Sequence, residues 1–172
     1  SYAELAEAGM TPPSIDDFLY KGGYPRIYAW GIDPVDFFPS YVATYIERDV
    51  RNELGVRKLA EFGTFLSLCA ARTGEILNID SLASDCGISV DTAKSWISVL
   101  EQSFIVFRLQ PYYRNYGKRL IKSPKLYFYD TGLAANLLGI ESPDHLFSDQ
   151  HRGSLYENAV VSEVVKGYYA LG

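Results

Sequence analysis

The stretch LASDCGISVDTAKSWISVLEQSFIVFRL at residues 82–109 constrains the fold more than any other part of the sequence. Small, turn-forming and apolar residues recur in it at the spacing of two packed helices: Ala83, Gly87, Ile88, Ala93, Trp96 or Ile97, and Leu100. Gly87 allows the tight turn between the helices, and the apolar positions after it bury one face of the second helix. The stretch ends in strand-like residues. We therefore predict a helix-turn-helix that leads into a strand.

Apolar periodicity and capping residues predict the elements around this stretch. With the two helices of that stretch included, the predicted helices cover residues 1–9, a short segment capped by Ser14, residues 34–54 capped by Asp33, residues 58–72, residues 82–86 capped by Asp80 or Ser81, residues 89–102 capped by Ser89, residues 130–139 capped by Thr131, and residues 153–169. Strands are predicted over residues 104–113 and 125–129. Two segments are predicted to be irregular: residues 21–34, because of Gly22, Gly23 and Pro25, and the loop that contains Pro143.

Together these elements predict a mainly α fold with a small antiparallel β wing, in which a helical bundle accompanies a winged helix-turn-helix. Residues 1–57 form a helical linker region, residues 58–130 the winged helix-turn-helix, and residues 131–172 a helical segment. With 48% hydrophobic residues the chain can bury a core. No apolar run reaches the roughly 18 residues that a membrane span needs, and no signal peptide is evident. A cytoplasmic location is therefore expected, with Cys69 and Cys86 as reduced core thiols.

The charge of the chain does not favour a sequence-specific DNA reader. The net charge is −5 and the pI is near 5.0. The outer face of the second helix should show Asp91, Thr92, Lys94, Ser95 and Ser98. A helix that reads the major groove needs Arg, Lys, Asn or Gln there, because those side chains reach base edges. Among the residues of the predicted outer face, Lys94 alone belongs to these base-reading types.

Positive charge is concentrated just downstream. Residues 102–129 contain no Asp or Glu but hold six of the chain's 16 basic residues: Arg108, Arg114, Lys118, Arg119, Lys122 and Lys125. A basic hairpin between two strands suits contacts to backbone phosphates, which are sequence-blind and salt-dependent. We predict nucleic-acid contacts by Lys94, Arg114, Lys118, Arg119, Lys122 and Lys125. Docking of the same patch on an acidic protein surface stays equally open, because charge alone does not select the partner.

Several strings occur in an order that resembles a known family. They are GGYPRIY at residue 22, YIERDVR at residue 45, the predicted winged helix, KLYFYDTGL at residue 125 and GSLYENAVVSEVVK at residue 153. Over nearly the entire chain they resemble the C-terminal domain of unknown function of a large prokaryotic family of AAA-type predicted ATPases. The resemblance implies a missing ATPase domain before this chain, which would bind ATP and magnesium. It also implies a restriction-nuclease-like fold that begins near residue 153.

The chain departs from both implied activities. No GxxxxGK[ST] occurs in it, so we expect no ATP binding or hydrolysis by this chain itself. Glu157 matches the helix glutamate of the nuclease-like pattern, but Glu163 lies six residues further and one carboxylate does not hold a metal. We therefore expect a non-catalytic regulatory module without a cofactor of its own. The expected partners are DNA and the missing domains of the same protein.

Three further groups of residues are open to two interpretations each. Gly22, Gly23 and Pro25 can form a backbone turn or a partner site. The charges of Glu47, Arg48 and Asp49 are typical of a solvated helix face, although the resemblance allows an interdomain contact there. The histidines His145 and His151, near Asp144 and Asp149, have a spacing that suggests a metal site or ordinary surface residues.

Overall fold

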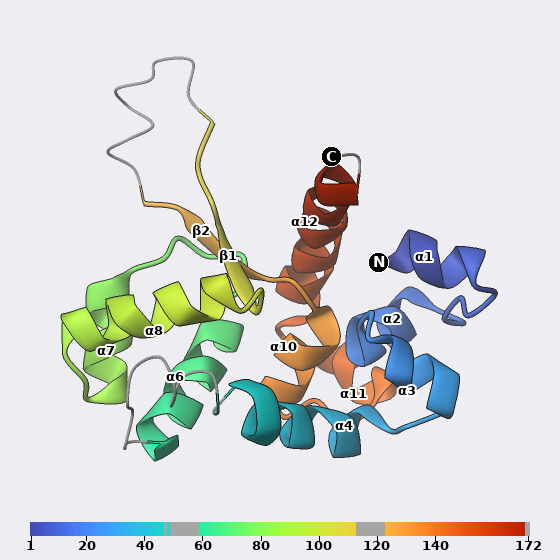
Figure 1. Cartoon of the computed structure of the whole chain (residues 1–172), viewed down its shortest axis with the longest axis horizontal. Helices are drawn as coiled ribbons and strands as arrows, with labels where there is room; N and C mark the ends of the chain where they lie inside the picture. The colour runs from blue at the N-terminus through green and yellow to red at the C-terminus, as the bar shows by residue number, and fades with distance from the viewer. Residues whose placement is uncertain (47, 49–58, 113–122, 171–172) are drawn as a thin grey trace.

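The computed structural model describes residues 1–46, 48, 59–112 and 123–170. It is mainly helical with one small antiparallel sheet (Figure 1), as predicted. Helices α6, α7 and α8 lie at one end of the molecule, α1, α2 and α3 lie at the other, and α4, α10 and α12 lie between them (Figure 1). None of the described helices is long and apolar enough to cross a membrane.

The N-terminal part is a series of short helices. They are α1 (Tyr2–Glu7), α2 (Ile15–Lys21), α3 (Pro25–Trp30), α4 (Pro34–Tyr41) and the π-helical turn η1 (Val42–Ile46). The Ser14 and Asp33 side chains accept hydrogen bonds from the first turns of α2 and α4, as predicted. The prediction of no regular element over residues 21–34 is wrong. Pro25 opens α3 at its first position, where a missing N–H costs nothing, and Gly31 ends it in the left-handed conformation.

The central part contains the two helices that the sequence placed around Gly87. Its elements are α6 (Leu59–Ala71), α7 (Ile79–Cys86), α8 (Val90–Gln102), β1 (Val106–Leu109) and β2 (Lys125–Phe128). Ser89 caps α8 as predicted, but α7 begins earlier than expected, because Asn78 and not Asp80 or Ser81 is its cap. Trp96 of α8 is buried edge-on against Phe62 and Phe65 of α6 at 5.3 and 5.2 Å between ring centroids. It is a core residue.

A third segment that the sequence did not reveal extends the sheet. β1 and β2 pair antiparallel, with Arg108 opposite Leu126. On the other edge of β2, Gly74 N donates to Leu126 O at 2.8 Å and Leu77 N donates to Pro124 O at 2.8 Å. Residues 74–77 thus run beside β2 as a short edge segment, with an isolated bridge at Ile76.

Asn158 continues the same edge of β2 beyond Gly74, opposite Phe128. The Phe128 N–H donates to Asn158 Oδ1 at 2.7 Å, and Asn158 Nδ2 donates to Phe128 O at 2.9 Å. Asn158 is fully buried. Its side-chain amide therefore replaces a neighbouring strand, and it fixes the last helix to the sheet.

The C-terminal part consists of α10 (Thr131–Leu137), α11 (Pro143–Ser148) and α12 (Arg152–Ala170). Asp130 and not Thr131 caps α10, since its Oδ1 accepts from Leu133 N at 3.0 Å. The predicted loop around Pro143 is wrong as well: Pro143 is the first residue of α11, and the Ser142 side chain caps that helix. The first correction moves the cap of α10 by one residue. The second shows that Pro143 starts a helix instead of interrupting the chain.

Asp130 also joins the turn after α2 to the start of α10. Its Oδ2 accepts from Gly23 N at 2.7 Å. At Gly22, where φ is +70°, a Cβ would lie 2.1 Å from Asp130 Oδ1, and at Gly132 a Cβ would lie 2.6 Å from Gly22 N and from the Lys21 carbonyl. The GGYPRIY and YFYDTGL strings therefore meet in space, and their glycines permit backbones to approach closely. This contact supports the backbone interpretation of Gly22 and Gly23.

One hydrophobic cluster runs through these parts. It includes Phe38 of α4, Leu66 of α6, Trp96 of α8, Phe128 of β2 and Leu155 of α12. Because α10 packs against α2, α4, α6 and α12, it lies at the centre of this core. The division at residues 57 and 130 stays a prediction.

Candidate nucleic-acid interface

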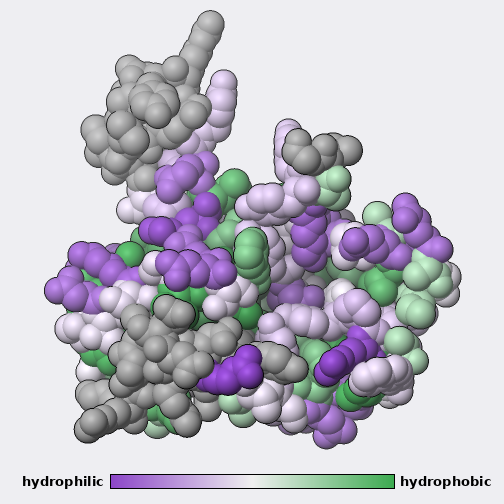
Figure 2. All heavy atoms as spheres, viewed as in Figure 1, coloured by the Kyte–Doolittle hydropathy of each residue, from purple (hydrophilic) through white to green (hydrophobic). Residues whose placement is uncertain are grey.

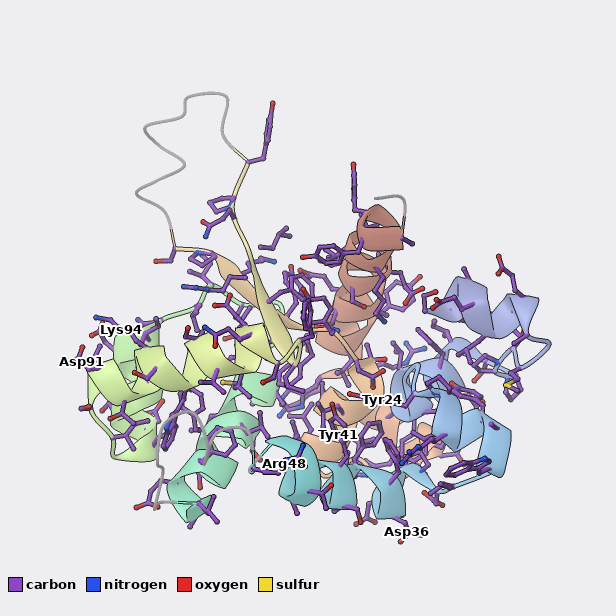
Figure 3. All side chains as sticks on the ribbon, in the orientation of Figure 1. Tyr24, Asp36, Tyr41, Arg48, Asp91 and Lys94 are labelled. Carbon is purple, nitrogen blue, oxygen red and sulfur yellow. The ribbon has the colours of Figure 1, made fainter. Side chains whose placement is uncertain are left out.

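The outer face of α8 carries the side chains that the sequence assigned to it. Asp91, Lys94, Ser95 and Ser98 are exposed, while Thr92 is half-buried and lies 2.8 Å from Ser89 Oγ. Lys94 Nζ lies 3.7 Å from Asp91 Oδ1, one turn away on the same helix (Figure 3). On the face seen in Figure 2, hydrophilic residues dominate at the α7–α8 end of the molecule. The outer face of this helix is polar, and its only lysine has an aspartate beside it.

Arg108 of β1 lies at the base of the connection between the two strands. Its guanidinium donates two hydrogen bonds to Glu101, at 2.7 Å from Nε and 2.6 Å from Nη2. The hydrogen bonds to Glu101 raise the pKa of Arg108. Together with Lys94, Asp80 and Ser123 it lines a hollow of about 420 Å³ between α7, α8 and the sheet. The structure therefore brings Lys94 and Arg108 to one concave surface.

Lys125 belongs to the opposite face of the sheet. Side chains alternate along a strand, and Leu126, not Lys125, lies opposite Arg108. Lys125 Nζ lies 2.9 Å from Glu157 Oε1 of α12, which also accepts from the Tyr127 hydroxyl at 2.6 Å. Lys125 is thus separated from the Lys94 and Arg108 hollow, and its charge is compensated by Glu157.

The other predicted phosphate contacts, Arg114, Lys118, Arg119 and Lys122, lie outside the described residues. They belong to the connection between β1 and β2. Residues 113–122 carry these four basic side chains and no acidic one. The role of this basic segment stays a prediction.

Glu157, the residue that matches the nuclease-like pattern, accepts hydrogen bonds from two residues of β2 in this chain. Hydrogen bonds from Lys125 and then Tyr127 hold the pKa of its carboxyl below the ordinary value. Glu163 is occupied elsewhere, since its Oε2 accepts from Tyr2 N at 2.7 Å and its Oε1 from Lys166 Nζ at 3.1 Å. Within the residues that the structure describes, no group of three or more His, Cys, Asp or Glu side chains could hold a metal.

The lowered pKa of Glu157 predicts a pH-dependent contribution to stability. A carboxyl with a folded pKa below its unfolded value near 4.5 stabilises the fold fully above that value, and the contribution disappears as pH falls through the folded pKa. We expect Glu157→Gln to lower the urea midpoint at pH 7. The difference from wild type should shrink at pH 3. Because the carboxylate is partly exposed, the effect should be small, and an equal difference at both pH values would contradict this role.

The remaining candidate residues form local contacts. Asp149 Oδ1 accepts from His151 N at 2.7 Å and lies 2.8 Å from His151 Nδ1, while Asp149 Oδ2 lies 3.8 Å from His145 Nε2. Cys69 and Cys86 are free and buried, and burial raises the pKa of both thiols. Glu47 and Asp49 lie outside the described residues. Arg48 is exposed and lies far from Asp91 and Lys94 (Figure 3).

The GGYPRIY string also contributes to an aromatic hollow. Tyr24 contacts Tyr41 at 5.0 Å and Phe37 at 5.4 Å between ring centroids, and these rings line a hollow of about 670 Å³ with Asp36 at its edge (Figure 3). Burial raises the pKa of Tyr24 far above its ordinary range. Local sequence did not reveal this cluster, because Tyr24 and the two rings of α4 come from separate segments of the chain.

By its fold the chain is a mainly helical module with a small antiparallel sheet. It belongs to the family described as a domain of unknown function (DUF8612), whose model matches residues 13–144. It is also 30% identical over 170 residues to an uncharacterized protein of Mycobacterium tuberculosis (Rv2008c) and to one of Mycobacterium bovis (Mb2031c). In each case the match covers 94% of this chain but 38% of the relative. No solved structure matches the chain.

Proposed function

We propose that residues 58–130 form a winged helix-turn-helix and that the chain is a non-catalytic module which contacts nucleic-acid phosphates through its basic segment. The order of strands supports the first part. Residues 74–77, between α6 and α7, lie beside β2, and β2 lies beside β1. Each helix and strand thus occurs in the order that a helix-turn-helix with a β-hairpin wing requires.

The observation that carries the phosphate proposal is the place of the basic segment, residues 113–122, in the order of the elements. It connects two antiparallel strands whose base adjoins the hollow of Lys94 and Arg108. A patch of Lys and Arg without acidic neighbours attracts the phosphate backbone irrespective of sequence. Because α8 offers few base-reading side chains, we expect affinity without sequence preference.

Removal of two charges from the basic segment tests this proposal. We expect Lys118→Gln/Arg119→Gln to weaken binding to a 20-base-pair duplex roughly tenfold at about 50 mM salt, and to reduce the slope of log K against log salt by about 2. Fluorescence anisotropy titrations at several salt concentrations measure both quantities. The matched control, Lys21→Gln/Arg26→Gln, removes the same two residue types from α2 and α3.

The control variant has the same net charge as the test variant, so it separates a local contact from general attraction. Equal weakening by both variants would contradict a contact at the wing. Absence of binding by the wild-type chain at micromolar concentration and low salt would contradict nucleic-acid binding altogether.

We infer further that the module belongs to a larger AAA-type ATPase. The ordered strings from residue 22 to residue 166 support this inference, and the greater length of the mycobacterial relatives leaves room for an ATPase domain. ATP and magnesium would then bind that domain and not this chain. The expected finding is a GxxxxGK[ST] sequence upstream of Ser1 in the complete reading frame, and a frame without one would contradict the assignment.

One observation favours a docking function instead. Each predicted contact residue that the structure describes already has an acidic neighbour: Lys94 has Asp91 and Lys125 has Glu157. Such pairs reduce the positive potential available to a phosphate backbone. Under this alternative, a separately produced ATPase domain should co-elute with this chain, and duplex DNA should not bind.

A further inference from the structure

One side of α12 exposes a continuous apolar strip. Tyr156, Val160, Val164 and Tyr168 follow one another at four-residue spacing, and they are 51%, 51%, 56% and 76% exposed. A helix on the surface of a protein ordinarily turns polar residues outward. Contiguous exposed apolar surface of this kind marks an interaction site.

Neighbouring helices turn this strip into a groove. Tyr2 of α1 and Ile15 of α2 are also exposed, at 37% and 39%, and they line a hollow of about 450 Å³ together with Tyr156, Val160 and Val164. Glu163 is the charged residue of the lining, and its oxygens accept from Tyr2 N and Lys166 Nζ. The groove therefore offers a partner an apolar, concave surface.

This chemistry restricts what can occupy the groove. The backbone N–H and C=O groups of an occupant must already be hydrogen-bonded within the occupant, because the apolar walls of the groove offer them no partners. A helix or sheet face with apolar side chains meets this condition, whereas an extended peptide does not. The curated relatives contain much more polypeptide than the 38% that this chain matches.

We propose that the groove of α12 docks an apolar face of the remaining part of the same polypeptide in the full-length protein, which rests on the inference above that this chain is a module of a longer protein. A second copy fits less well. The strip from Tyr156 to Tyr168 is about 18 Å long, and one helix face of that length falls well short of the ~800 Å² per partner that is typical of stable complexes. A tethered domain needs less contact area, since its effective concentration is on the order of millimolar.

Cysteine labelling of the full-length protein tests this docking. Val160→Cys and, separately, Phe147→Cys are compared, because Val160 and Phe147 are both more than half exposed here and only Val160 lies in the groove. With maleimide, we expect the cysteine at position 160 to react at least ~10-fold more slowly than the cysteine at position 147, each relative to its rate in denaturant. The buried Cys69 and Cys86 supply the background rate.

Two further measurements make the result decisive. Val164→Cys repeats the test at a second groove position, in case one variant does not fold. Dilution then distinguishes the source of protection: intramolecular docking is independent of protein concentration, whereas protection by a second copy is lost on dilution. Equal labelling at positions 160 and 147, or protection that disappears on dilution, would overturn the proposal. Neither result bears on the proposed phosphate binding, because Lys94 lines a different hollow that shares none of the residues of this groove.

Discussion

Gly132→Ala is expected to destabilise the chain by roughly 3 kcal/mol, which is large beside the effect of an ordinary surface substitution. The new Cβ would lie 2.6 Å from Gly22 N, Lys21 C and Lys21 O. These are backbone atoms and cannot rotate away, so the contact between α10 and α2 must open. For a chain of this size such a loss lowers Tm by roughly 6–12 °C, which thermal unfolding followed by circular dichroism will measure.

Gly63→Ala is the matched control for this change. Gly63 lies within α6, and a Cβ there would meet nothing within 4 Å. Because alanine is the better helix former, we expect Gly63→Ala to stabilise the chain by about 0.5–1 kcal/mol. Should Gly132→Ala melt together with wild type, the close approach of the two strings would not be the reason for glycine at that position.

The two glycine strings also show how far the sequence could predict the fold. Local rules identified the turn at Gly22 and the caps Ser14, Asp33 and Ser89, because each depends on residues within one helical turn. They could not show that Gly132 packs on Gly22, since no periodicity links distant segments. The sequence does contain a local signal for helices α3 and α11: Pro25 and Pro143 are first helical residues, although proline also occurs at breaks between elements.

The candidate interface also has one part that the sequence predicts and one part that it does not. Sequence placed Asp91, Lys94, Ser95 and Ser98 correctly on the outer face of α8, because helical spacing alone determines that face. It did not identify the partners of the basic residues. Glu157 is 32 residues from Lys125 in sequence and is brought to it by the packing of α12 on β2. A count of charges therefore overstates the positive surface that the folded chain presents.

Asn158→Leu should also be strongly destabilising, by about 3–5 kcal/mol, although leucine has the same branching at Cγ as asparagine. The change removes the hydrogen bonds to the N–H and the C=O of Phe128 and leaves both groups buried. Each buried group without a partner costs about 1–3 kcal/mol. Urea unfolding measures the total, and Asn136→Leu, at a half-buried position on α10, is the control for the substitution itself.

A residue-level measurement distinguishes loss of this contact from general loosening. If Asn158 replaces a neighbouring strand, the Phe128 amide in Asn158→Leu should exchange with solvent much faster than an amide on the β1 side of β2. Tyr129 N–H, directly after β2, is such an amide and donates to Ile105 O at 3.0 Å. Uniform acceleration across the sheet would instead indicate global destabilisation. The side-chain amide of Asn158 fixes α12 to β2, so Asn158→Leu should also alter the groove of α12. The pairing of Arg108 with Glu101 should persist.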